Sequence, residues 1–301
     1  MCLLLKEQRQ RSQAAGYKNN KNEWYAKSDE CSLTIEDNNM MNNMMKNKLM
    51  NKKNAHKAVF ALAGVVLIST TLSSAQAAVA LDRTRAIITG DEKSISLNIS
   101  NENKQLPYLA QGWVENEKGE KISDPFTVLP PVQRVEPGAK SQIKIQALPS
   151  AASLPQDRES VYYFNLREIP PKSDKPNTLQ LALQTRIKLF YRPKSIIPTR
   201  EQMDNPWQEK VTLTRQGNQY TINNPTAYYV SFVDAVPNKN GQTVAGFEPV
   251  MVAPKSSKAL NVSADALGNK PVLTYINDYG GRPTLSFTCQ GNSCHVVPEK
   301  K

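Results

Sequence analysis

Thr178–Arg192 reads TLQLALQTRIKLFYR, with apolar residues at most odd positions and mostly polar residues at the even positions. Successive side chains of a β-strand point to opposite faces, so this alternation predicts one strand with a continuous apolar face. At ~3.3 Å per residue the strand would run for roughly 50 Å, well beyond the usual strand length. We therefore expect that it bends between two sheets or that part of its apolar face serves a partner.

Shorter alternating runs precede this stretch and are separated by Pro, Gly, Asn and Asp. The predicted strands are Ala80–Ile88, Lys93–Asn101, Leu106–Glu115, Phe126–Leu129, Ser141–Leu148, Ser160–Glu168 and Thr178–Arg192 itself. Seven strands at this spacing are typical of an immunoglobulin-like sandwich. The Cys…Trp…Cys pattern of antibody domains is absent, and Trp113 is a candidate core residue.

Prolines 193, 198 and 206 interrupt the pattern, so Pro193–Asn205 is the expected hinge between two domains. Further runs follow at Lys210–Thr214, Gln219–Asn223, Tyr228–Ala235, Phe247–Val252, Ser257–Val262, Val272–Asn277, Thr284–Cys289 and His295–Val297. The fold class predicted is all-β, with a first immunoglobulin-like domain over residues 78–196 and a second over residues 197–301.

Residues 50–77 have the three parts of a secretory signal. A basic start leads into the apolar run Ala58–Ile68 and then into Ala75-Gln76-Ala77, an A-x-A cleavage site. A transmembrane anchor is the alternative, but it needs about 20 apolar residues. We expect export with cleavage after Ala77. Residues 1–49, rich in Asn, Lys and Met, are expected to be an unstructured upstream segment outside the mature chain.

The expected mature chain keeps two cysteines, Cys289 and Cys294, and one histidine, His295. Two close cysteines in an exported chain indicate a disulfide that closes a tight hairpin. A Cys-x4-Cys-His metal site is the alternative, although three ligands are too few for a structural zinc site. We expect no metal and no cofactor.

Catalytic patterns are missing. The sequence contains no G-x-S-x-G, Walker A or H-E-x-x-H motif, and the expected mature chain has a single histidine near its end, which argues against a Ser-His-Asp arrangement. Asp157 and Glu159 flank Arg158, which is typical of an ordinary ion pair. We expect a protein that is not an enzyme and has no small-molecule substrate.

The full chain has a net charge of +11, and the positive charges after residue 77 are scattered rather than gathered in runs. Such a balance suits an acidic partner or a bound carboxylate and does not by itself imply nucleic acid. Two cations remain ambiguous from spacing alone. Arg85 could be a solvated strand residue, and Lys188 could either extend its charge to solvent or bind an anion.

Six motifs together resemble the periplasmic pilus chaperones of the PapD family. They are LDRTRAI (Leu81–Ile87), SNENKQLPYLAQ (Ser100–Gln111), PPVQRVEPGAKS (Pro130–Ser141), LPQDRESVYYFNLREIPP (Leu154–Pro171), LQLALQTRIKLFYRP (Leu179–Pro193) and YINDYGGRPTLSF (Tyr275–Phe287). The resemblance spans both predicted domains and leaves residues 1–49 untouched. It implies two immunoglobulin-like domains in a boomerang arrangement with a cleft between them.

The resemblance also implies a mechanism. A pilus subunit is an immunoglobulin-like domain without its last strand, and the chaperone lends one of its own strands to the open groove before delivering the subunit to an outer-membrane usher. Leu179, Leu181 and Leu183 are the expected donor-strand residues. Arg85 and Lys188 match the family residues that grip the subunit's C-terminal carboxylate.

A separate set of charges matches the family's inter-domain ion pairs, namely Glu159, Arg192 and Asp278. The family's second domain often carries a disulfide near its end, in agreement with Cys289–Cys294. An exported immunoglobulin-like adhesion or ligand-binding module, or a structural subunit, is the competing class. A subunit would be a single incomplete domain, whereas this sequence predicts two domains.

Processing gives the first testable prediction. The protein recovered from the periplasm should begin at Ala78, because the A-x-A site ends at Ala77. Intact-mass and N-terminal peptide analysis would measure the start, and a chain that keeps residues 50–77 would contradict the signal-peptide interpretation.

Overall fold

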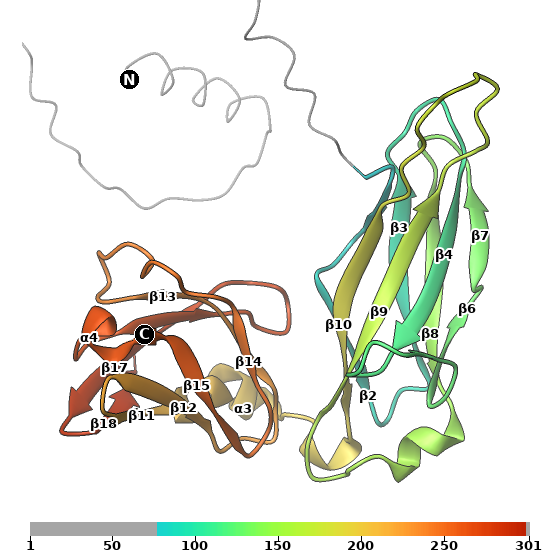
Figure 1. Ribbon diagram of the computed structural model, residues 1–301. Coiled ribbons are helices and arrows are strands. Elements are labelled where there is room, and N and C mark those ends of the chain that lie inside the picture. The colour runs from blue at the N-terminus through green and yellow to red at the C-terminus, as the bar shows by residue number, and fades with distance from the viewer. Residues whose placement is uncertain (1–76, 299–301) are drawn as a thin grey trace, which may run out of the picture. The chain divides into compact units, whose positions relative to one another are not determined.

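A computed structural model describes residues 77–298 of the chain (Figure 1). The upstream segment 1–49 and nearly all of the predicted signal peptide 50–77 lie outside these residues, as do residues 299–301. Within residues 77–298 no helix is long and apolar enough to cross a membrane.

The first domain is built from two sheets that enclose one apolar core. The first sheet is antiparallel, in the order β1 (Val79–Leu81), β3 (Ser94–Asn101), β8 (Lys140–Ala147) and β6 (Phe126–Leu129). The second has the order β2 (Arg85–Thr89), β10 (Gln184–Arg192), β9 (Ser160–Ile169), β4 (Tyr108–Glu115) and β5 (Lys121–Ile122), and β7 (Val132–Val135) also pairs with β4. A short 3₁₀ turn, η1 (Pro149–Ser153), precedes β9.

Alternation explains which side chains enter this core. Ile88 of β2, Leu97 of β3, Ile143 of β8, Phe164 of β9 and Leu189 of β10 are all fully buried in one cluster. The pairing of β2 with β10 is parallel, whereas the other strand pairs of the domain are antiparallel.

Three sequence predictions for this domain need correction. The predicted strand Ala80–Ile88 is two strands, because exposed residues 82–84 carry the chain from the first sheet to the second. The predicted strand Thr178–Arg192 begins only at Gln184. The strands β5 and β7 were not expected, since they are short and bounded by turns.

The second domain is also all-β. Its hydrogen-bonded strand order is β14 (Val250–Val252), β13 (Val230–Val236), β16 (Val272–Tyr275), β17 (Thr284–Gln290), β18 (Ser293–Val296), β11 (Thr212–Gln216), β12 (Gln219–Asn224) and β15 (Ser256–Ser263). β17 pairs first with β16 and then with β18, so it links the two layers. Tyr220, Phe232 and Phe287 are the largest of its fully buried side chains.

The predicted hinge Pro193–Asn205 is more structured than the prolines indicated. It contains η2 (Lys194–Ile196) and α3 (Arg200–Asp204), followed by η3 (Trp207–Lys210). Thr199 caps α3 in a capping box with Gln202, which explains why a helix begins there. A second short helix, α4 (Ala264–Leu267), is capped by Ser263. The strands of the second domain differ from the predicted ones mainly at their ends.

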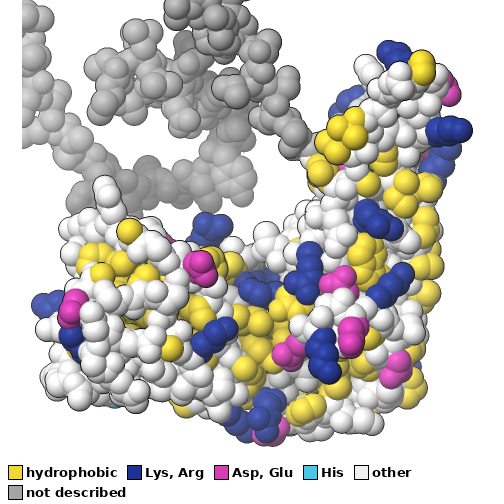
Figure 2. Space-filling view, in the orientation of Figure 1, with side chains coloured by type: hydrophobic (Ala, Val, Ile, Leu, Met, Phe, Trp, Pro, Cys, Tyr) yellow, Lys and Arg dark blue, Asp and Glu magenta, His cyan; other side chains and the backbone are white. Residues whose placement is uncertain are grey.

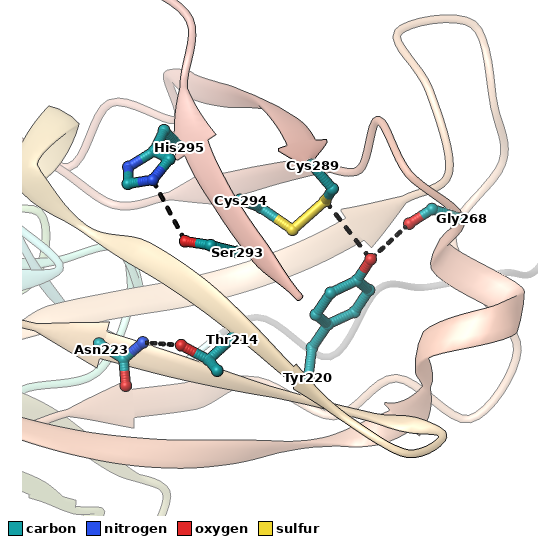
Figure 3. Close-up of a disulfide and its surroundings, with 8 residues drawn as sticks. All are labelled: Thr214, Tyr220, Asn223, Gly268, Cys289, Ser293, Cys294 and His295. Carbon is teal, nitrogen blue, oxygen red and sulfur yellow. Dashed lines mark hydrogen bonds between the residues drawn. A yellow bond between two sulfur atoms is a disulfide. The ribbon is translucent and has the colours of Figure 1, made fainter. Parts of the chain in front are cut away.

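Cys289 and Cys294 form a disulfide across the β17–β18 turn (Figure 3). Their Cα atoms are 3.9 Å apart and the two residues are register partners. The Tyr220 hydroxyl lies 3.4 Å from Cys289 Sγ and donates to the Gly268 carbonyl oxygen at 2.8 Å. The disulfide therefore closes a hairpin over the buried Tyr220.

Replacing both cysteines by serine should lower the free energy of unfolding by about 2 kcal/mol, because the loop closed by the bond is very short. Urea unfolding of the double variant measures the loss. Since the disulfide is in the second domain, binding through the first domain should not change, and a loss of binding by a fully folded double variant would contradict this local role.

Candidate functional site

The three leucines of the quoted stretch are exposed. Leu179, Leu181 and Leu183 keep 83%, 67% and 41% of their surface accessible. Ile187, Leu189 and Tyr191 follow at the same parity and are buried in the core. The apolar face of this stretch is therefore divided at the start of β10. Its side chains before Gln184 face solvent, and those from Ile187 onward belong to the core.

The backbone changes pairing at the same place. β10 pairs with β9 from Gln184 to Tyr191, and the Glu168 N–H extends this contact by donating to the Leu183 carbonyl oxygen at 3.0 Å. On its other side β10 pairs with β2 only from Lys188 to Arg192. Among the described strands, therefore, the edge of residues 184–187 on the β2 side has no partner.

Arg85 and Lys188 stand side by side where β2 begins. They are direct register partners in the parallel pair, so their side chains leave the sheet on the same face. Lys188 Nζ lies 3.2 Å from Ser231 Oγ, and Arg85 Nη1 donates to the Ile276 carbonyl oxygen at 2.9 Å. Arg85 is only 8% exposed, which excludes the solvated reading of this residue.

Both cations lack a carboxylate partner among the described residues. The guanidinium of Arg85 lies 5.8 Å from the Phe190 ring centre, and its buried Nε has no hydrogen-bond partner. Burial lowers the pKa of Lys188, and the neighbouring Arg85 charge lowers it further. Burial also lowers the pKa of Arg85, against the more distant carboxylates of Asp278 and Glu159. An anion placed between the two cations would relieve both effects.

Glu159, Arg192 and Asp278 meet in a second charged cluster. Arg192 donates through Nε and Nη2 to Glu159 Oε1 at 2.8 and 2.7 Å, and through Nη1 to Asp278 Oδ2 at 2.8 Å. The Tyr229 N–H donates to Glu159 Oε2 at 2.8 Å. The cluster therefore joins the ends of β9 and β10 to two segments of the second domain.

Burial raises the pKa of Glu159 to about 7, and Arg192 and the Tyr229 N–H counteract this rise. Arg192 and the Tyr229 N–H thus favour the ionised form of a carboxylate that burial disfavours. Two carboxylates compensate one arginine here, so the cluster leaves no cation free for a ligand. This separates it from the Arg85–Lys188 pair.

Aromatic residues that the sequence analysis did not identify hold Arg192 in place. The rings of Trp207 and Tyr228 lie 5.3 and 5.0 Å from its guanidinium carbon and stack on each other at 4.3 Å. The Tyr228 hydroxyl donates to the Ile196 carbonyl oxygen at 2.6 Å. Periodicity does not single out these residues, because Trp207 begins the short turn η3 and Tyr228 lies just before β13.

Trp113 is not in the core, contrary to the sequence interpretation. Gly112 takes the inward position, where a Cβ atom would lie 2.9 Å from Val128 Cγ1. Trp113 therefore projects from the outer face of β4, with Arg167 and Lys121 at 5.5 and 5.6 Å from its ring. Figure 2 shows hydrophobic and basic side chains interspersed along the first domain.

Other residues that the sequence analysis considered for metal binding or acid–base chemistry make ordinary contacts. No group of three His, Cys, Asp or Glu side chains within residues 77–298 could hold a metal ion. Cys289 and Cys294 are bonded to each other, and His295 Nε2 lies 3.2 Å from Ser293 Oγ (Figure 3). Asp157 is paired with both Arg158 and Lys255 at the surface.

Comparison with known families defines the class of protein. Residues 78–197 match the N-terminal domain of the PapD pili and flagellar-assembly chaperones, and residues 206–287 match the C-terminal domain of PapD pili assembly chaperones. The chain belongs to the PapD family of pilus-assembly chaperones. The two-domain all-β fold is thereby confirmed, and the family is one of chaperones.

Individual relatives agree with this assignment. The chain is 54% identical over 235 residues to the probable fimbrial chaperone YfcS of Escherichia coli K12, covering 78% of this chain and 92% of that one. It is 52% identical over 230 residues to the chaperone protein PapD of Escherichia coli, covering 76% and 94%. A solved complex of the Salmonella enterica SafA pilin with the SafB chaperone matches with a TM-score of 0.59 and 26% identity, covering 71% of this chain and 97% of that one.

Removing Arg192 should destabilise the chain more than removing Glu159. In Arg192→Met the buried Glu159 carboxyl loses its cation, which costs about 3–5 kcal/mol. In Glu159→Gln the arginine keeps Asp278, and the cost should be about 1–3 kcal/mol. Urea unfolding measures both.

Arg158→Met provides a matched control, because the exposed Arg158–Asp157 pair should contribute little. Equal losses in Arg158→Met and Arg192→Met would contradict a structural role for the buried cluster.

Proposed function

We propose that this chaperone binds a pilus subunit by lending it residues 179–183 as a strand while Arg85 and Lys188 hold the subunit's C-terminal carboxylate. The observation that carries the proposal is the exposed leucine segment leading directly to an uncompensated pair of cations. The printed description of a relative as a chaperone in complex with a pilin supports the class of partner.

Strand geometry explains the leucines. Alternate residues of a strand point to the same face about 7 Å apart, so three leucines can fill three successive pockets. Burial of each is worth roughly 1.5–3 kcal/mol before the segment's ordering cost is subtracted. Backbone hydrogen bonds along the free edge add affinity without selecting a sequence, which suits a chaperone for several related subunits.

Charge selects the direction of the bound strand. A partner strand that follows residues 179–187 would occupy the edge that β2 takes from Lys188 onward. Parallel to β10, such a strand brings its C-terminal carboxylate to Arg85 and Lys188. Antiparallel to β10, it would bring its N-terminal ammonium to the same two cations and be repelled. The cation pair therefore favours the parallel strand and fixes its end.

Fixing the end also fixes the register. A shift of one residue turns every side chain of a strand to the opposite face, so the leucines would leave their pockets. An arginine can contact a carboxylate through two N–H groups and a lysine adds a compact charge. The two cations thus determine which subunit residues meet Leu179, Leu181 and Leu183.

The cellular setting follows from the family and the leader. We place the chaperone in the periplasm after cleavage at Ala77, where it would deliver bound subunits to an outer-membrane usher. A structure solved as the periplasmic chaperone SfaE is 30% identical to this chain, with a TM-score of 0.56. The proposed activity makes and breaks no covalent bond, and the charged cluster around Arg192 serves to join the domains.

Arg85→Ala and Lys188→Ala should each weaken subunit binding by roughly 10- to 100-fold, because one charge-assisted contact to the carboxylate is lost. Binding of a peptide matching a subunit's last strand measures the change, and Arg158→Ala is the control. Replacing the peptide's C-terminal carboxylate by a carboxamide should lower its affinity for the wild type, and should lower it less for Arg85→Ala, where only Lys188 still contacts the carboxylate. Equal losses from amidation in both proteins would contradict a carboxylate anchor.

Leu181→Glu should abolish subunit binding, because a charge would enter an apolar pocket unpaired. Its own thermal unfolding should not change, since Leu181 is solvent-exposed in the free chain. Val297→Glu, at an exposed valine of the second domain, is the matched control and should bind normally. Recovery of the subunit with Leu181→Glu at the wild-type level would show that the leucines do not enter the groove.

A further inference from the structure

Glu168 is a carboxylate at a core-facing position. It lies two and four residues after Leu166 and Phe164 on β9, so its side chain leaves the strand on their face. Only 5% of its surface is exposed. Glutamate is almost never buried this far unless it is paired, because a desolvated charge is costly.

Within residues 77–298 the carboxylate of Glu168 accepts one hydrogen bond, and it comes from the start of the first strand. The Val79 N–H donates to Glu168 Oε2 at 2.8 Å in a buried position. No ion pair among residues 77–298 includes Glu168. One neutral N–H leaves most of a buried negative charge uncompensated.

We propose that Glu168 is the binding site for the processed N-terminus of the chain itself. This rests on the proposed removal of the leader after Ala77. Cleavage converts the backbone nitrogen of Ala78 from a neutral amide into an ammonium group, one residue before the Val79 N–H that already contacts Glu168. Consecutive residues are separated by only about 3.8 Å, so the new cation forms within reach of the carboxylate.

The position of Ala78 is fixed by its neighbours. Its carbonyl oxygen accepts from the Glu102 N–H at 2.6 Å, and Val79 pairs with Asn101 of β3. Ala78 itself is buried, with 9% exposure. The ammonium is therefore held near Glu168 by backbone contacts and loses little additional entropy on pairing.

The same residue reaches the donor segment. The Glu168 backbone N–H donates to the carbonyl oxygen of Leu183, the last of the three exposed leucines. An ion pair between Ala78 and Glu168 would thus connect β1, the end of β9 and the base of the leucine segment. An uncleaved leader keeps a neutral amide at Ala78, so this connection would form only in the processed chain.

A charge-deletion cycle tests the pair. Chains prepared to begin at Ala78 by scarless proteolysis would be compared with Nα-acetylated ones, since acetylation removes the terminal charge and restores an amide there. Each form would carry either Glu168 or Glu168→Gln, whose side-chain oxygen can still accept from Val79 N–H. In the free-amine form Glu168→Gln should lower the unfolding midpoint by about 4 °C, and in the acetylated form it should not.

Equal shifts in the two forms would overturn the proposal, because Glu168 would then act through Val79 alone. A rise in the midpoint in both forms would overturn it as well.

If the Glu168→Gln chain does not fold, the reactivity of the wild-type α-amino group tests the proposal instead. This group should react with an acylating reagent at least about tenfold more slowly in the folded chain than in urea, since one unit of log rate corresponds to a 1.4 kcal/mol interaction. Equal rates would contradict pairing.

The failure of the leader proposal is detected separately. The intact mass of the periplasmic protein shows where the cell cleaves the chain, whereas the cycle uses chains that begin at Ala78 by preparation. If the cell cleaves at another residue but Glu168→Gln lowers the midpoint only in the free-amine form, the processing site is rejected and the ion pair between Glu168 and an ammonium at Ala78 is retained. Cleavage at Ala77 with a negative cycle would reject only the ion pair.

Discussion

The parallel pairing of β2 with β10 is the constraint on which the rest of the structure depends. It sets Arg85 directly beside Lys188 and therefore creates two adjacent cations at a single point of the sheet. It also ends at that point, because β2 begins at Arg85. Among the strands of residues 77–298, none pairs with that side of β10 before Lys188, and the exposed leucines continue this unpaired edge.

A free apolar edge carries a cost in a protein that works alone. Unpaired strand edges and exposed leucines promote self-association. In this chain only the short segment 179–183 exposes its leucines, whereas Ile187, Leu189 and Tyr191, which follow at the same parity, are buried in the core. The part of β10 that pairs with β9 and β2 thus supports the segment that we propose is lent to a subunit.

The Arg85–Lys188 pair and the cluster around Arg192 are both at least partly buried, but they differ in whether a carboxylate compensates the positive charge. Arg192 contacts two carboxylates and is stacked on two aromatic rings, so its charge is used within the chain. Arg85 and Lys188 are also partly buried, yet the pKa of each is lowered and neither contacts a carboxylate among the described residues. The first arrangement compensates its charge within the chain, and the second is the pair that we propose binds the carboxylate of a subunit.

Much of the fold was predictable from the alternation of residues, including most strands and the two β domains. The strand end at Gln184 was not, because a period of two is the same in a paired strand and in an exposed segment. The proximity of Arg85 and Lys188 was also beyond periodicity, since it depends on which strands pair. Family resemblance indicated these residues, and the outward position of Trp113 follows from the close packing of Gly112 against Val128.

Amide hydrogen exchange of residues 179–187 tests the central claim most directly. In the free chaperone these amides should exchange rapidly over 179–183, whereas those of β10 beyond Lys188 should be protected by pairing on both sides. Binding of a subunit should protect alternate amides of the segment up to Lys188 and leave the second domain unchanged. Unaltered exchange in this segment on binding, with protection gained elsewhere, would contradict the account.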